Sequence, residues 1–168
     1  MGGRTVIALN GPLNAGKSHV GRELSRRLPE ARFIEGDDHG APPDSPLAVR
    51  IGAAMTRLET QVLGMRCRWL IVAFPLREAD MARLRRAAEQ RGAAICCITL
   101  APPLAVTLAN RGARELTAWE RMRLPRMYEE GFAQRAFSDL LLDNSEETVA
   151  ATAERILVWL ETFPSFSH

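Results

Sequence analysis

Short apolar runs alternate along the chain with longer segments in which apolar residues recur every three or four positions. Runs of consecutive apolar residues predict buried strands, and the longer periodicity predicts helices with one apolar face. Strands are predicted at residues 5–10, 31–36, 68–74, 93–100 and 139–144. Helices are predicted at residues 17–28, 46–65, 77–92, 102–112, 117–135 (interrupted or restarted at Pro125) and 146–163.

This pattern predicts an α/β fold in a single domain. Nearly continuous apolar strands that alternate with helices are typical of a parallel sheet with helices on both faces. We therefore expect three layers joined by right-handed crossovers, and 168 residues suit one such domain. Ligands of these folds bind beyond the carboxyl ends of the strands. The segments of most interest are therefore residues 10–18, 36–40, 74–77 and 100–103.

Charge and composition narrow the range of partners. The formal net charge is +2, and the basic residues are almost all arginines spread along the chain, with a local excess between residues 111 and 126. This balance gives no case for a nucleic-acid or membrane partner. No apolar run approaches the roughly 20 residues that span a membrane. The N-terminus lacks the pattern of a secretory signal, so we expect a cytoplasmic protein.

Three cysteines are present, Cys67, Cys96 and Cys97. Their odd number and the apolar run around the adjacent pair predict buried free thiols in a reducing compartment. A redox switch formed by the adjacent pair is the alternative.

The segment after the first strand carries the strongest chemical signal. It reads GPLNAGKS and fits the pattern G-x-x-x-x-G-K-[ST] with a strand before it and a helix after it. Glycines let such a loop turn its backbone N–H groups toward phosphate oxygens, and the helix start adds the positive end of its dipole. Lys17 would bind the β- and γ-phosphates and Ser18 would bind Mg²⁺. The predicted nucleotide-binding residues are Gly11, Pro12, Leu13, Asn14, Ala15, Gly16, Lys17, Ser18 and His19.

An acidic segment follows the second predicted strand. The third strand ends in Pro75 without a carboxylate, whereas the second is followed by EGDDHG. Asp37 is predicted to help hold Mg²⁺, and Asp37 or Asp38 to accept the proton of an attacking hydroxyl. An ordinary solvated turn is the alternative for the pair. His39 either orients the substrate or is an ordinary loop histidine.

The stretches NGPLNAGKS, FIEGDDH and LIVAFPLRE resemble the small P-loop kinases of the shikimate kinase and gluconate kinase group, which are related to nucleoside monophosphate kinases. The resemblance extends over nearly the whole chain in element order and length. It implies a five-stranded parallel sheet in the order 2-3-1-4-5, and a carboxylate, Asp37 or Asp38, beside the acceptor hydroxyl and Mg²⁺. AFPLRE is similar to a strand end of adenylate kinases. That likeness implies that Arg77 faces the acceptor or the transferred phosphate, with a surface arginine that opens a helix as the alternative.

The same resemblance implies a short lid at about residues 111–123. Arg111 and Arg114 are predicted to neutralise charge in the transition state or to stack on adenine, and a helix with a solvated basic face is the alternative. In related kinases the segment after the last strand forms part of the adenine pocket. Asn144 or Ser145 is predicted to cap the final helix.

Together these features predict an ATP- and Mg²⁺-dependent kinase that phosphorylates a hydroxyl group of a small molecule. The acceptor would be similar to shikimate, to gluconate or to an antibiotic. A nucleotide-binding or ATP-hydrolysing module that acts through a partner is the alternative from another class. We expect a monomer or homodimer.

Overall fold

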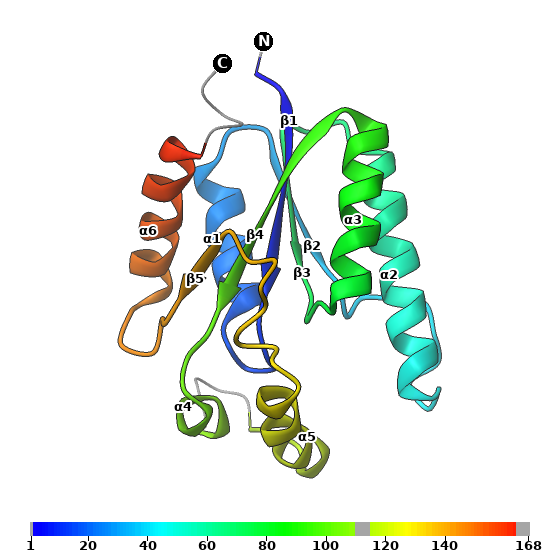
Figure 1. Cartoon of the computed structure of the whole chain (residues 1–168), viewed down its shortest axis with the longest axis vertical. Coiled ribbons are helices and arrows are strands. Elements are labelled where there is room, and N and C mark those ends of the chain that lie inside the picture. Colours follow the sequence, from blue (N-terminus) through cyan, green and yellow to red (C-terminus); the bar gives the residue numbers. More distant parts are fainter. Residues whose placement is uncertain (1, 110–114, 164–168) are drawn as a thin grey trace.

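The computed structural model describes residues 2–109 and 115–163, and it contains a five-stranded parallel sheet (Figure 1). The strand order is β2-β3-β1-β4-β5, which confirms the predicted fold class and sheet order. The central position of β1 places the loop that follows it between the ends of β3 and β4. The strands are β1 (Arg4–Asn10), β2 (Ala31–Glu35), β3 (Trp69–Ala73), β4 (Ala93–Leu100) and β5 (Leu140–Leu142).

Helices cover both faces of the sheet. Two of them, α1 and α6, pack on one face, α2 and α3 pack on the other, and α4 and α5 lie beyond the carboxyl ends of the strands (Figure 1). The helices of the described residues are α1 (Lys17–Arg27), α2 (Leu47–Leu63), α3 (Glu78–Arg91), α4 (Leu104–Leu108), α5 (Ala118–Glu129) and α6 (Val149–Thr162). Within these residues, no helix has the length and apolar character that a membrane crossing requires.

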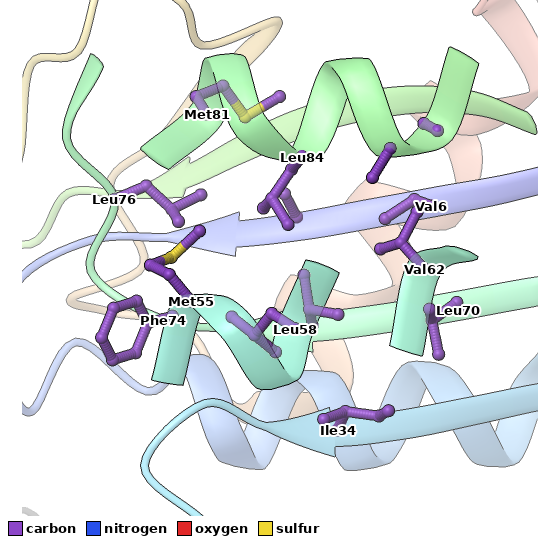
Figure 2. Close-up of a cluster of buried hydrophobic side chains, with 14 of the residues drawn as sticks. Val6, Ile34, Met55, Leu58, Val62, Leu70, Phe74, Leu76, Met81 and Leu84 are labelled. Carbon is purple, nitrogen blue, oxygen red and sulfur yellow. The ribbon is translucent and has the colours of Figure 1, made fainter. Parts of the chain in front are cut away.

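Successive residues of the central strand face opposite layers of the core. Val6 and Ala8 belong to the cluster beneath α2 and α3, whereas Ile7 and Leu9 belong to the cluster beneath α1 and α6. All four side chains are fully buried. Figure 2 shows the first cluster, in which Leu58 of α2 and Leu84 of α3 pack with other apolar side chains on one face of the sheet. A strand that is buried on both faces must be apolar at every position, which explains the continuous apolar runs of the sequence.

Each predicted strand and helix has a counterpart among the described residues, and several are shorter than predicted, among them α6, which begins at Val149. Helix α5 continues through Pro125, so the predicted interruption there is wrong. The neighbouring Leu124 and Met127 are buried, and their packing offsets the one backbone hydrogen bond that proline removes. The last strand is shorter than predicted and has three residues. Helix α3 ends as expected at Gly92, which adopts a left-handed conformation with φ +67°.

The cysteines are free thiols, and the adjacent pair is fully buried. Burial raises the pKa of both thiols above the ordinary value, that of Cys97 to about 12. A thiol reacts as its thiolate, so Cys96 and Cys97 are poorly suited to a redox role.

The end of β1 is joined to three other segments through one buried side chain. The Asn10 amide nitrogen donates to Thr99 Oγ1 at 3.0 Å and to the Phe132 carbonyl at 3.4 Å. Its Oδ1 accepts the Leu76 N–H at 2.7 Å. Asn10 therefore ties the residue before the phosphate loop to the end of β4, to the segment after β3 and to the segment after α5.

Replacing Asn10 with alanine is expected to lower the free energy of unfolding by about 2–4 kcal/mol, because the buried Leu76 N–H and Phe132 carbonyl lose their partner. Urea denaturation of the variant and the wild type measures this difference. Gln90→Ala, at an exposed site on α3, serves as the control and is expected to change stability by less than about 0.5 kcal/mol. Equal stability of Asn10→Ala and Gln90→Ala would show that the Asn10 network contributes nothing.

Candidate active site

The loop between β1 and α1 has the backbone shape that its glycines predict. Gly11 and Gly16 have φ values of +145° and +96°, and Asn14 lies in the left-handed region at +59°. A Cβ at Gly11 would lie 2.5 Å from the Leu100 carbonyl oxygen, so only glycine fits at this position. Helix α1 begins directly after Gly16, and its first N–H groups are available to an anion.

Lys17 is the only lysine of the chain, and it is buried at the start of α1. Its Nζ donates to the carbonyls of Gly11 at 3.0 Å and Pro12 at 2.6 Å, so the side chain lies along the loop. Burial lowers the Lys17 pKa from 10.5 to about 8, and the nearby carboxylates of Asp37 and Glu35 partly oppose this effect. The ammonium is poorly solvated, and a bound phosphate would compensate its charge.

Nucleotide affinity is expected to decrease as the pH rises above about 8. A bound phosphate raises the Lys17 pKa because an opposite charge favours the ammonium. Binding above the pKa of the free protein, which is about 8, therefore takes up a proton, and the affinity falls by up to about tenfold per pH unit. Calorimetric titration with ATP across this pH range measures the effect. An affinity that stays constant between about pH 7 and pH 9.5 would contradict it.

A cavity of about 620 Å³ surrounds the phosphate loop and the first turns of α1. Ser18 and His19 line it together with Lys17, and so do Glu35 and Asp37 from the end of β2 and the residues after it. The predicted nucleotide-binding residues Leu13, Asn14 and Gly16 line it as well. Pro12 and Ala15 contribute backbone carbonyls to the loop's hydrogen bonds.

Asn144 contacts the phosphate loop instead of capping the last helix. Its amide nitrogen donates to the Ala15 carbonyl at 2.9 Å, and the side chain is buried. Helix α6 begins at Val149 and is capped by Thr148, whose hydroxyl accepts the Ala151 N–H. The predicted cap at Asn144 or Ser145 is wrong, because the helix starts several residues later than the sequence pattern indicated.

The two aspartates of the acidic segment point to different surroundings. Asp37 lines the cavity around the phosphate loop and also a second cavity next to it. The side chain of Asp38 is 80% exposed, and its Oδ2 lies 3.6 Å from Arg57 Nη2 on α2. His39 lines the second cavity, and its Nδ1 accepts the Ala41 N–H at 3.3 Å. The geometry thus favours Asp37 over Asp38 as the proton acceptor. The roles of both aspartates stay predictions.

The second cavity has a volume of about 540 Å³ and lies between α2, α5 and the ends of β2 and β3. It shares Leu13, Asp37 and Pro75 with the first cavity. Arg77 lines the second cavity, and its guanidinium donates to Asp80 at 2.9 and 3.0 Å. The hydrogen bond to Asp80 raises the Arg77 pKa. The predicted contact of Arg77 with the acceptor or the transferred phosphate stays a prediction. A phosphate there would have to compete with Asp80 for the Arg77 guanidinium.

Two predicted catalytic arginines, Arg111 and Arg114, lie outside the described residues. Of the predicted lid at about 111–123, the described part contains the start of α5, which borders the second cavity through Trp119, Glu120 and Arg123. The Arg123 guanidinium pairs with both oxygens of Glu130 at 2.7 and 2.9 Å.

A magnesium ion would require ligands from the nucleotide as well as from the protein. Among the described residues, no group of three or more His, Cys, Asp or Glu side chains could hold a metal ion. Mg²⁺ commonly binds through one or two protein oxygens together with phosphates and water. The Ser18 hydroxyl and the Asp37 carboxylate line one cavity and fit that donor set.

Several residues of the site were not singled out by sequence reasoning. Glu35 lines the cavity around the phosphate loop, and Arg50, Trp119 and Phe132 line the second cavity. Glu35 occupies the last position of a strand, which is the signal that could have identified it. Arg50 of α2 lies far in the sequence from Trp119 and Phe132, and no local pattern connects it with them.

No protein-family model and no curated protein sequence matches the chain. Solved structures match it in fold. A tunicamycin resistance protein from Deinococcus radiodurans has 22% sequence identity and a TM-score of 0.64, with 94% of this chain and 95% of that one covered. A shikimate kinase from Acinetobacter baumannii has 18% sequence identity and a TM-score of 0.61, with 95% of this chain and 93% of that one covered. A gluconokinase from Sinorhizobium meliloti has 15% sequence identity and a TM-score of 0.68, with 97% of this chain and 100% of that one covered. The chain has the fold of the small P-loop kinases over nearly its whole length, which confirms the predicted resemblance.

Proposed function

We propose that the protein is a phosphotransferase that moves the γ-phosphoryl group of Mg-ATP to a hydroxyl group of a small molecule. The observation that carries this proposal is the position of Asp37 on the wall shared by two cavities. One cavity contains the phosphate loop, and the other has room for an acceptor. A carboxylate between them is suited to accept the proton of a hydroxyl that attacks the terminal phosphate.

In the proposed reaction the acceptor oxygen forms a bond to the γ-phosphorus while the bond between that phosphorus and the bridging oxygen of ADP breaks. The proton of the hydroxyl passes to Asp37, and ADP leaves. Lys17 and the N–H groups at the start of α1 stabilise the negative charge of the phosphates. Mg²⁺, when bound with the nucleotide, would neutralise charge on the β- and γ-phosphates. Arg111 and Arg114 are proposed to add positive charge at the transition state.

The Asn144 side chain also supports nucleotide binding in the cavity around the phosphate loop. Asn144 lines the first cavity, and its buried Oδ1 has no hydrogen-bond partner within the described residues. A buried acceptor without a donor is costly, and a donor on a bound ligand would satisfy it. We propose that the Asn144 side chain contributes to holding the nucleotide.

The fold does not select among acceptors, because a tunicamycin resistance protein, a shikimate kinase and a gluconokinase all share it. The test is an ADP-release assay with Mg-ATP against sugars, sugar acids, shikimate, nucleosides and hydroxylated antibiotics. Release that depends on one acceptor is the expected result. Tight ATP binding without acceptor-dependent release across the panel would favour a nucleotide-binding module that acts through a partner.

Nucleotide binding has an independent test, because Lys17 is the only side-chain amine in the chain. Acetic anhydride near pH 8 is expected to modify Lys17 and the terminal amine, and Mg-ATP is expected to protect Lys17 alone. Peptide mass spectrometry separates the two sites. Equal modification of Lys17 with and without Mg-ATP would place the nucleotide elsewhere.

A further inference from the structure

The second cavity differs in chemistry from the cavity around the phosphate loop. Of the described residues that line it, nine of sixteen are apolar, against five of sixteen around the phosphate loop. Ile51, Phe74, Met127 and Phe132 are among them. Its volume of about 540 Å³ falls in the range of roughly 300–1,000 Å³ that is usual for sites of drug-sized ligands.

Most of the charged side chains that line the second cavity are already paired within the protein. Arg77 is bound to Asp80 by two side-chain hydrogen bonds. Arg123 and Glu130 form a bidentate pair. A ligand rich in hydroxyl groups would have to break these pairs or bury hydroxyls without partners, at about 1–3 kcal/mol for each unsatisfied group.

Glu120, which also lines the second cavity, is held in the capping box of α5, where its carboxylate accepts the Thr117 N–H at 2.7 Å. This hydrogen bond ties the Glu120 carboxylate to the start of α5.

Trp119 of α5 borders the same cavity and is 42% exposed. The Arg50 guanidinium of α2 lies over its ring, 5.9 Å from the ring centre. Leu47, in the first turn of α2, is 38% exposed and lines the same cavity. An indole ring and a guanidinium group both stack favourably on aromatic rings.

We infer that the acceptor is an alcohol whose body is a flat apolar ring system, and that it is neither a polyol nor a sugar acid. The inference rests on the proposed phosphotransfer for the role of the hydroxyl, which would point toward Asp37. The apolar wall and the part of Trp119 that Arg50 leaves exposed would hold the ring, and burial of the ring would supply most of the affinity.

Binding is tested first, without any turnover. The probe is naphthalenemethanol, and the readout is the indole N–H NMR signal of Trp119, identified among the three tryptophans of the chain by its loss in Trp119→Phe. A saturable shift of this signal with naphthalenemethanol, and none with gluconate or shikimate at equal concentration, is expected. Failure of naphthalenemethanol to shift the signal, or a larger response to gluconate or shikimate, would overturn the inference.

Two neighbouring residues of α2 supply matched variants. Ala48 lines the second cavity, whereas Val49 is 52% exposed and does not line it. Ala48→Glu is expected to weaken naphthalenemethanol binding by tenfold or more, and Val49→Glu by less than twofold. Equal effects of the two substitutions would show that the probe binds elsewhere.

Turnover separates the inference from the proposed function. Acceptor-dependent ADP release with an aromatic alcohol supports both. Release with gluconate or shikimate alone supports phosphotransfer and overturns the inferred acceptor class. Saturable probe binding that Ala48→Glu abolishes, with no release for any acceptor, supports the ligand class of the cavity and contradicts the proposed function.

Discussion

Replacing Lys17 with alanine is expected to lower acceptor-dependent turnover by about a thousandfold and to weaken ATP binding. Removing one preorganised donor to a developing negative charge typically costs a factor of about 10²–10³, and Lys17 carries a full charge in a buried position. Lys17→Arg is expected to be almost as damaging, because the larger guanidinium does not fit where Nζ lies 2.6 Å from the Pro12 carbonyl. Steady-state kinetics and calorimetry measure both effects.

The stability of the same variant distinguishes a functional lysine from a structural one. Burial lowers the Lys17 pKa from 10.5 to about 8, and a change of this size corresponds to a cost of about 3 kcal/mol for holding the charged form. The unfolded chain binds more protons at Lys17 than the folded chain between about pH 8 and pH 10.5, so this group makes stability rise with pH in that window.

Lys17→Ala is therefore expected to have nearly the stability of the wild type at pH 7, since removal of the costly charge offsets the loss of the hydrogen bonds to the Gly11 and Pro12 carbonyls. The rise in stability above pH 8 that Lys17 causes is expected to be absent from the variant. Arg26→Ala, on an exposed part of the same helix, is the control and is expected to retain full turnover. A Lys17→Ala protein that keeps its ATP affinity and turnover would contradict the assignment of the phosphate loop.

The sequence predicts those parts of the candidate site that are local in the chain. The phosphate loop is defined by the spacing of Gly11, Gly16, Lys17 and Ser18, and the continuous apolar strands defined a parallel sheet. The sheet order came from the resemblance to known kinases, because apolar runs alone do not specify which strand lies beside which.

The rest of the site depends on contacts between distant segments. The second cavity brings Arg50 of α2 beside Trp119 of α5, and no periodicity relates those positions. The function of Asn10 in joining three segments is equally nonlocal. The cap of α6 could have been predicted from the sequence, because Thr148 is a suitable capping residue just before an apolar helical pattern.

The choice between Asp37 and Asp38 also required the structure. Adjacent side chains in a turn point in different directions, so the sequence GDDH could not indicate which carboxylate faces a ligand. The backbone turns at this point, with the Asp38 N–H donating to the Glu35 carbonyl at 3.3 Å. Asp37 lies beside both cavities, and Asp38 points to solvent and Arg57.

Asp37→Asn is expected to lower kcat by about 10²–10³, whereas Asp38→Asn changes it by less than about threefold. General-base catalysis typically contributes a factor of about 10²–10⁴, and asparagine keeps the shape of the side chain while losing its basicity. The two substitutions remove the same charge from neighbouring positions, so each controls for the net charge of the segment. Acceptor-dependent ADP release measures the activity of both variants. Full activity of both would show that the acidic segment is an ordinary solvated turn without a catalytic role.

The reactivity of Lys17 reports whether each variant keeps its local structure. The Asp37 carboxylate raises the Lys17 pKa in the wild type, so Asp37→Asn is expected to lower that pKa and to speed acylation of Lys17 at neutral pH. A collapsed or unfolded site would give the slow reaction of an ordinary lysine with a pKa near 10.4. Loss of turnover together with faster acylation therefore identifies Asp37 as a catalytic carboxylate in an intact site. Loss of turnover with slow acylation would instead mean that Asp37 is needed to hold the phosphate loop in place.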